Sequence, residues 1–126
     1  MLDKFKNKIA YYLSFINGQT ISKYKSDKNG LLTIQYVNGS LALDSKNANY
    51  SFNQLHKGFR IAFKYIITPA FQPKNVLILG MGGGSAINIL HNEIHLSCNI
   101  TAIEHDGVII KLAKKYFNLN EYKNLT

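Results

Sequence analysis

The sequence predicts an α/β protein in which a small antiparallel β-meander precedes a doubly wound parallel sheet. Three observations predict this class. An apolar, β-branched run at 75–79 leads directly into the glycine-rich segment 80–85. A second predicted strand follows at 100–104, and each strand is followed by residues at helical spacing. Upstream, Asn-Gly pairs separate short alternating segments, as they do in antiparallel hairpins.

Composition limits the classes of protein that the chain can belong to. Its 126 residues, 46% hydrophobic and 17% charged, suffice for an ordinary folded core. No apolar run approaches the roughly 20 residues of a membrane-spanning helix, so no membrane partner is expected. The single cysteine, Cys98, cannot form an internal disulfide, which fits a reducing cytoplasm. We therefore expect a cytoplasmic protein.

The formal net charge of +8 arises within residues 1–75, and residues 76–126 are neutral overall. Only Arg60 among the 15 basic residues is an arginine, although phosphate and base recognition favour the bidentate arginine fork. No cluster of five or more basic residues occurs. We interpret the charge as a basic, solvated surface, and nucleic acid is not the expected partner.

Residues 1–18 predict an amphipathic helix. The apolar residues at helical spacing are Phe5, Ile9, Tyr12, Leu13 and Ile16. Three lysines before a short apolar stretch also resemble a signal peptide, but the stretch contains tyrosines and a serine and lacks a cleavage site. The helix is favoured, and it packs either on the body of the protein or on a partner.

Residues 19–49 predict a small antiparallel β-domain. Turns with positive φ are expected at Asn17-Gly18, Asn29-Gly30 and Asn38-Gly39. They delimit three short strands at about 20–27, 31–37 and 41–43. Three strands alone are marginal in stability, so their apolar face must lie on a larger body.

Residues 50–126 predict the first half of a Rossmann-like sheet. A helix over about 51–68 ends before Pro69, and strand 75–79 is expected to be buried on both faces. The loop 80–85, a helix over 86–92 and a strand over 100–104 come next. Asp106 then caps a last helix. Strand, loop, helix, strand, helix is the opening order of a doubly wound sheet, here with only two parallel strands.

The loop and the end of the second strand carry the predicted chemistry. Glycines between a strand and a helix let a ligand approach the backbone, and the helix N-terminus favours an anionic group. Glu104 falls at the tip of the second strand, where a carboxylate can accept hydrogen bonds from both ribose hydroxyls. His105, beside it, either touches the ligand or lies in solvent. A nucleoside ligand is therefore expected, although Ser85 departs from the dinucleotide fingerprint.

The spacing Gly80-x-Gly82-x-Gly84 resembles motif I of S-adenosylmethionine-dependent methyltransferases. The run from Val76 to Gly84 and the block Ile103-Glu104-His105-Asp106 are similar to the spermidine synthase-like branch of that superfamily. The likeness covers roughly residues 20–126. It implies that S-adenosyl-L-methionine is bound by a set of seven residues: Gly80, Met81, Gly82, Gly83, Gly84, Glu104 and His105. It also implies methyl transfer, with an acceptor that the sequence does not identify.

Two departures from that branch bear on the reaction. Aminopropyltransferases carry an Asp in the glycine loop where this chain has Gly83, and a Gln where it has Lys25. A cationic amine needs carboxylates around it, and Lys25 would repel it. Spermidine synthesis is therefore not expected. Aminopropyl transfer to an unusual acceptor and a non-catalytic relative that docks on a partner stay open as alternatives.

In this branch a third strand, and an Asp that contacts the adenine, follow about where residues 124–126 stand. The chain is therefore expected to be the N-terminal part of a longer protein or a truncated relative, and no catalytic residue is assigned. Alone, it is expected to be inactive and to bind the cofactor poorly or not at all. Uncovered apolar edges and faces are expected to cause self-association or poor solubility.

Four further residues were considered for a site. His91 and His95 lack acidic or thiol neighbours in sequence, so no metal site is expected. Cys98 precedes a buried strand and is interpreted as a packing residue. Tyr50 is the best candidate to line a cleft between the meander and the α/β body.

Overall fold

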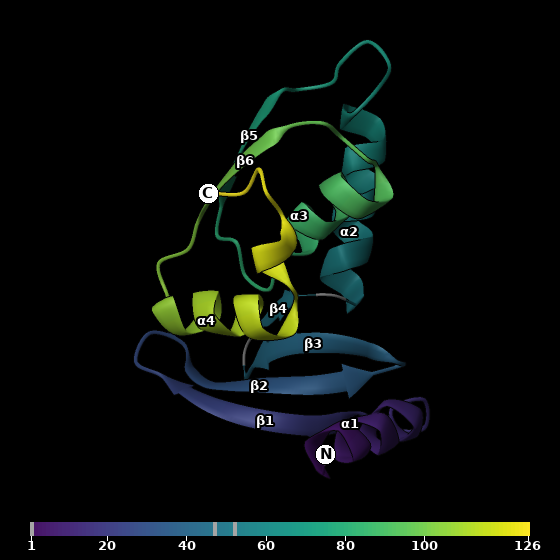
Figure 1. The fold of residues 1–126 in the computed structure, drawn as a ribbon, viewed down its shortest axis with the longest axis vertical. Helices are drawn as coiled ribbons and strands as arrows, with labels where there is room; N and C mark the ends of the chain where they lie inside the picture. Colours follow the sequence, from purple (N-terminus) through teal and green to yellow (C-terminus); the bar gives the residue numbers. More distant parts are fainter. Residues whose placement is uncertain (1, 47, 52) are drawn as a thin grey trace.

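The computed structural model describes residues 2–46, 48–51 and 53–126. Residues 1, 47 and 52, which fall within predicted segments, lie outside the described residues. The fold contains a four-stranded sheet in the order β1-β2-β3-β4 and a two-stranded sheet, β5-β6. Figure 1 shows the two sheets toward opposite ends of the molecule, with α4 (Gly107–Tyr116) between them. The predicted fold class is confirmed.

The antiparallel sheet has one strand more than the sequence predicted. Its strands are β1 (Gln19–Ser26), β2 (Gly30–Val37), β3 (Ser40–Ser45) and β4 (Asn49–Ser51). The strand missed was β4, because three residues are too few to show alternation. It pairs antiparallel with β3, with Asp44 opposite Asn49.

Two of the three predicted turns have the expected backbone. Gly30 has φ 68°, and the Asn38-Gly39 pair has φ 48° and 73°. The prediction for Asn17-Gly18 was wrong, because neither residue adopts a positive φ. There the chain leaves a helical turn instead, with the Asn17 amide donating to the carbonyl of Leu13.

One face of the antiparallel sheet packs on α4. Leu32, Ile34 and Leu43 are fully buried, and they form one core cluster with Ile109 and Leu112 of the helix. This cluster supplies the larger body on which the meander was expected to lie.

The second part of the chain follows the predicted order of elements. It comprises α2 (Asn53–Ile66), β5 (Asn75–Leu79), α3 (Ser85–Asn88), the π-helical turn η1 (Ile89–Glu93), β6 (Asn99–Ile103), α4 and the 3₁₀ turn η2 (Leu119–Glu121). Strands β5 and β6 pair in parallel, from Asn75 opposite Asn99 to Leu79 opposite Ile103. Beyond η2, the Thr126 amide donates to the carbonyl of Ile100 at 2.9 Å, which extends the parallel hydrogen bonding beside β6.

Strand β5 is buried on one face only, which corrects the expectation of burial on both. Val76 and Ile78 pack against the core formed with α2, α3 and η1. On the other face Leu77 and Leu79 are 61% and 74% exposed, and Ile103 of β6 is 53% exposed. The helices of the parallel part therefore cover a single side of this sheet.

Helix α1 (Leu2–Leu13) contacts β1 and β2 at one end of the molecule. The residues of its predicted apolar side do not pack on the body, which was one of the two expected placements: Phe5, Ile9, Tyr12 and Leu13 are all exposed. Among the residues that the structure describes, no helix combines the length and apolar character that crossing a membrane requires.

Candidate functional site

The glycine loop after β5 contains three residues in the left-handed region. Gly80, Gly82 and Gly84 have φ of 81°, 55° and 87°. A side chain at Gly82 would place its Cβ 2.3 Å from the carbonyl oxygen of Tyr50, and one at Gly84 would meet Leu119 at 2.6 Å. At Gly80 no heavy atom lies within 4 Å of that position. The first glycine thus leaves open space, whereas the next two permit close packing.

Strand β4 holds the loop in place. The Gly83 amide donates to the carbonyl of Tyr50 at 2.9 Å. This contact joins the antiparallel sheet to the parallel one at the loop itself. The strand that sequence reasoning missed is therefore the one that positions the glycine loop.

Glu104 follows β6 directly and meets the glycine loop. Its Oε2 accepts from the Gly82 amide at 3.1 Å and its Oε1 from the Asp106 amide at 3.1 Å. Only 9% of its side chain is exposed. A carboxylate has about four acceptor positions, so these two bonds fix its orientation and leave capacity for hydroxyl groups of a ligand.

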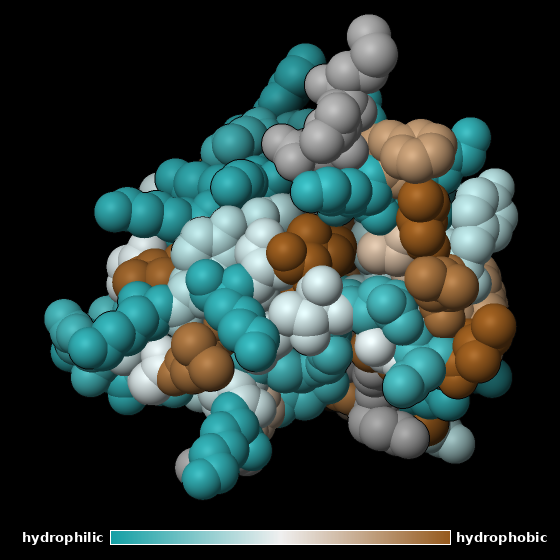
Figure 2. All heavy atoms as spheres, turned by 90° about the horizontal axis from the view of Figure 1, so that it is seen from below, coloured by the Kyte–Doolittle hydropathy of each residue, from teal (hydrophilic) through white to brown (hydrophobic). Residues whose placement is uncertain are grey.

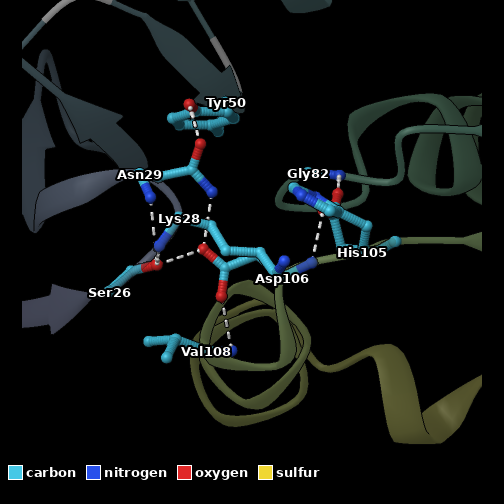
Figure 3. A network of polar contacts seen from close by, with 9 residues as sticks. Ser26, Lys28, Asn29, Tyr50, Gly82, His105, Asp106 and Val108 are labelled. Carbon is cyan, nitrogen blue, oxygen red and sulfur yellow. Dashed lines mark hydrogen bonds and ion pairs between the residues drawn. The ribbon is translucent and has the colours of Figure 1, made fainter.

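Asp106 caps α4 as predicted, and it also binds the antiparallel sheet (Figure 3). Its Oδ1 accepts from the Val108 amide at 2.8 Å, and its Oδ2 accepts from Ser26 Oγ and Asn29 Nδ2, each at 2.5 Å. Burial alone would raise the pKa of Asp106, but these hydrogen bonds and one from the Ile109 amide together lower it. The carboxylate therefore stays ionised and ties the β1–β2 turn to α4.

Tyr50 and Asn29 extend this network toward the glycine loop. The Tyr50 hydroxyl donates to Asn29 Oδ1 at 2.9 Å, while the amide group of Asn29 reaches Asp106. Ser26 and Asn29 were not predicted as site residues. Asn29 was interpreted only as a turn former, and nothing in the local sequence indicates that its side chain reaches across 77 residues to Asp106.

A cavity of about 320 Å³ lies where these elements meet, with walls from the β1–β2 turn, β4, α2, the glycine loop and the end of β6. Five of the seven residues predicted to bind a cofactor line it, namely Gly80, Met81, Gly82, Glu104 and His105. Gly83 and Gly84 are buried in the loop and do not line it. Tyr50 lines it, as predicted for a cleft between the two parts of the chain.

The structure also places Lys25 and His105 relative to the cavity. Lys25 is exposed on β1, opposite Leu31 of β2, and it does not line the cavity, so it does not face a ligand there. The side chain of His105 is 70% exposed and its Nδ1 lies 3.9 Å from Glu104 Oε1. It is therefore a solvent-accessible wall of the cavity, which combines the two placements considered for it.

Helix α2, which supplies Leu55 and Phe59 to the cavity wall, is fastened by an ion pair. Arg60 donates through Nε and Nη2 to Glu93 of η1 at 2.6 and 2.9 Å, and His56 Nε2 lies 2.7 Å from the same carboxylate. The Arg60 hydrogen bonds, aided by His56, lower the pKa of Glu93 to about 2.

Of the remaining candidates, His91 and Cys98 pack within the protein, whereas His95 is exposed. His91 stacks on Tyr122 with ring centroids 5.0 Å apart, and Cys98 is a buried member of the core, where burial raises the pKa of its thiol. The packing interpretation of Cys98 is confirmed. Within the described part of the chain, no three His, Cys, Asp or Glu residues gather as metal ligands would.

A second cavity, of about 370 Å³, adjoins the first. Met81 and Glu104 line both, and the second is bordered also by Lys114 of α4 and by Thr126. Glu104 therefore stands between two spaces that a ligand can reach.

Comparisons with known proteins agree with this architecture. Over 50 residues the chain is 40% identical to an eEF1A lysine and N-terminal methyltransferase homolog of Drosophila pseudoobscura pseudoobscura. It is 38% identical over the same length to the corresponding protein of Drosophila melanogaster. In both cases the match covers 40% of this chain and only 7% of the relative. No family model matches the chain.

Solved structures with a similar fold include two spermidine synthases. One, solved in complex with the transition-state analogue AdoDATO, superposes with a TM-score of 0.61 at 19% identity. The other, from Thermotoga maritima, gives 0.60 at 20% identity. Each match covers 86% of this chain and less than two fifths of the other, 38% and 39%. The chain thus has the fold of part of a spermidine synthase, the S-adenosylmethionine-dependent methyltransferase-like fold that its sequence resembles.

Proposed function

We propose that this chain binds S-adenosyl-L-methionine in the cavity beside the glycine loop and serves in methyl transfer to an acceptor. The observation that carries the proposal is the Glu104 carboxylate, which ends a parallel strand, contacts the Gly82 amide at 3.1 Å and lines the cavity. A carboxylate at that place suits the two hydroxyls of a ribose.

The residues around the cavity fit such a ligand. Beside Gly80 the space that a side chain would fill is open, so a ligand can approach the backbone there. The cavity of about 320 Å³ is of the size that small-molecule sites have. We propose that Gly80, Met81, Gly82, Gly83 and Gly84 shape the cradle, and that Glu104 and His105 contact the nucleoside.

The bound cofactor would supply an electrophilic methyl group on a sulfonium. The protein's part is then to bind and orient the two reactants. Methyl transfer is supported by the similarity to methyltransferase homologs over 50 residues. Aminopropyl transfer is not favoured, because Glu104 is the only acidic residue among the described residues that line this cavity, and a cationic amine acceptor needs more.

Calorimetric titration with S-adenosyl-L-methionine, extended to the millimolar range, tests the proposal. Glu104→Gln should weaken binding by about 1–3 kcal/mol, the scale of a hydrogen bond to a charged group. Glu121→Gln is the matched control, because Glu121 is exposed and lines neither cavity. Absence of heat at every concentration, or equal affinity of all three proteins, would contradict the proposal. Thermal melting establishes that the variants are folded.

A further inference from the structure

The apolar side of α1 faces solvent. Its residues form one line along the helix and the turn after it: Phe5, Ile9, Tyr12, Leu13 and Ile16, which we term the apolar strip. Their exposed fractions are 67%, 45%, 61%, 45% and 86%. Figure 2 shows a strip of hydrophobic atoms on the side of the molecule where α1 lies, among hydrophilic neighbours. A patch of this kind on a folded chain marks a surface that binds something.

The other side of the same segment makes the contacts with the body. Ser14 is buried, and its Oγ accepts from the Gly39 amide at 2.9 Å. Tyr11 packs edge-on against Tyr36 of β2, with ring centroids 5.7 Å apart. Because these contacts fix α1 by its more polar side, the outward direction of the apolar strip is set by the fold.

Lysines border the apolar strip on both sides. Successive residues of an α-helix lie about 100° apart, which places Lys6 beside Leu13 at one border and Lys8 beside Tyr12 at the other. All three lysines of the helix, Lys4 included, are exposed, and residues 4–16 contain no acid. Such an arrangement lets the amines reach past the apolar residues while their stems stay in contact with them.

Further positive charge lies on the adjoining strand. Lys23 and Lys25 of β1 are exposed. The alternate residues Ser22 and Tyr24 hydrogen-bond to Tyr116 of α4, so the two lysines project from the opposite face of the sheet. They add to the positive charge of residues 1–75 but do not border the apolar strip, because α1 lies on the face of Ser22 and Tyr24, with which Lys6 and Ala10 share a cavity.

We propose that α1 lies flat on the surface of an anionic lipid bilayer, with the apolar strip in the interfacial layer and the lysines against the lipid phosphates. An exposed apolar face flanked by lysines is the arrangement of helices that lie on membranes. A second copy of the chain is a poorer occupant, because two facing helices would bring six lysines together against only two acids, the Asp3 of each copy. This proposal departs from the expectation of no membrane partner, which rested only on the lack of a spanning segment.

Flotation of the whole chain with vesicles tests the proposal. The chain should bind vesicles that contain about one third phosphatidylglycerol, and it should not bind vesicles of pure phosphatidylcholine. Replacing Lys4, Lys6 and Lys8 together by Gln should lower the partition coefficient by about 100-fold, at about 1 kcal/mol per charge. Ile9→Asn should lower it by about 10-fold. The control Ile61→Asn, on the exposed part of α2, should leave it unchanged.

A fluorescent probe makes the test specific for the apolar strip, because the chain has no tryptophan. Tyr12→Trp should shift its emission to shorter wavelength on addition of the anionic vesicles. Tyr65→Trp, at an 80% exposed position on α2, should not. The proposal fails if neither tryptophan variant binds anionic vesicles, or if the emission of both variants shifts equally. It also fails if the chain binds no vesicles and Ile9→Asn abolishes self-association in light scattering, because the apolar strip would then be a contact between copies.

Discussion

The two sheets differ in how completely their apolar residues are covered. In the four-stranded sheet Leu32, Ile34 and Leu43 are 0% exposed, whereas Leu77 and Leu79 of the parallel sheet are more than half exposed. Both sets come from strands rich in apolar residues. Each sheet has one covered face, by α4 in the first and by α2, α3 and η1 in the second, so the difference arises at the open faces. The open face of the first sheet carries Lys23 and Lys25 and one exposed leucine, Leu31, whereas that of the second is apolar. An apolar sequence run thus predicts that a strand pairs within a sheet, but the burial of its side chains depends on whether a helix covers that face.

The site lies where the two sheets meet. Its glycine loop and Glu104 belong to the less covered sheet, yet Tyr50, Asn29 and Asp106 hold them against the well-covered one. We therefore expect the stability of the site to follow the antiparallel sheet and this junction, and to depend little on the open face of β5.

The largest effect should come from the covered sheet. Leu43→Ala removes a fully buried side chain and should lower the free energy of unfolding by about 4 kcal/mol. Leu79→Ala, at a 74% exposed position, should change it by less than about 0.5 kcal/mol. Urea unfolding measures both. Comparable losses for the two variants would mean that the open face is covered in solution.

The junction should come next. Asp106→Ala leaves the donors of Ser26, Asn29 and the Val108 amide without their acceptor and should destabilise the chain by about 3 kcal/mol. Asp27→Ala, an exposed acid in the same turn, is the control and should be nearly neutral. If thermal melting gives the same midpoint for both variants, Asp106 does not join the two parts of the molecule.

A smaller effect separates two glycines of one loop. Gly82→Ala should cost about 2 kcal/mol, because its φ is positive and its Cβ would meet the Tyr50 carbonyl at 2.3 Å. Gly80→Ala has only the unfavourable φ to accommodate and should cost about 1 kcal/mol. Chemical denaturation measures the free energy of unfolding of both variants. A larger loss for Gly80→Ala than for Gly82→Ala would show that β4 does not support the loop.

The smallest effect is a loss of stability at low pH. The pKa of Glu93 is about 2, against an ordinary 4.5, so its stabilising contribution is full above pH 4.5 and is lost as pH falls toward 2. Because Arg60 and Glu93 are exposed to solvent, the contribution is reduced to about 1 kcal/mol. Glu93→Gln should flatten the dependence of unfolding free energy on pH in this window. An unchanged slope would show that the ion pair does not fasten α2.

The sequence predicted the order of elements, the loop and the neighbouring acid, since these depend on local patterns. The run 75–79, the glycine spacing and the Asp106 cap each express a rule about adjacent residues. The position of Glu104 near the glycine loop follows from strand order, because the carboxyl ends of neighbouring parallel strands share one edge. Its hydrogen bond with the Gly82 amide was not predicted.

What the sequence did not predict depends on distant residues. Strand β4 forms because Asn49 pairs with Asp44 of β3. Asn29 joins the β1–β2 turn to α4 only because its side chain donates to Asp106. The open face of β5 and the outward direction of the apolar strip are likewise properties of packing. A local sequence pattern predicts a strand or a helix, but it does not show which distant residues pack against that element.

The most direct test of the central claim is the amide NMR spectrum of the isotope-labelled chain titrated with S-adenosyl-L-methionine. Four of the nine glycines lie in the loop, so glycine-selective labelling isolates the loop signals, and a uniformly labelled sample adds those of Glu104 and His105. We predict shifts at Gly80, Gly82 and Gly84 that saturate together with those of Glu104 and His105, while Gly18 and Gly39 stay unchanged. An unchanged loop, or shifts confined to glycines outside it, would contradict the account.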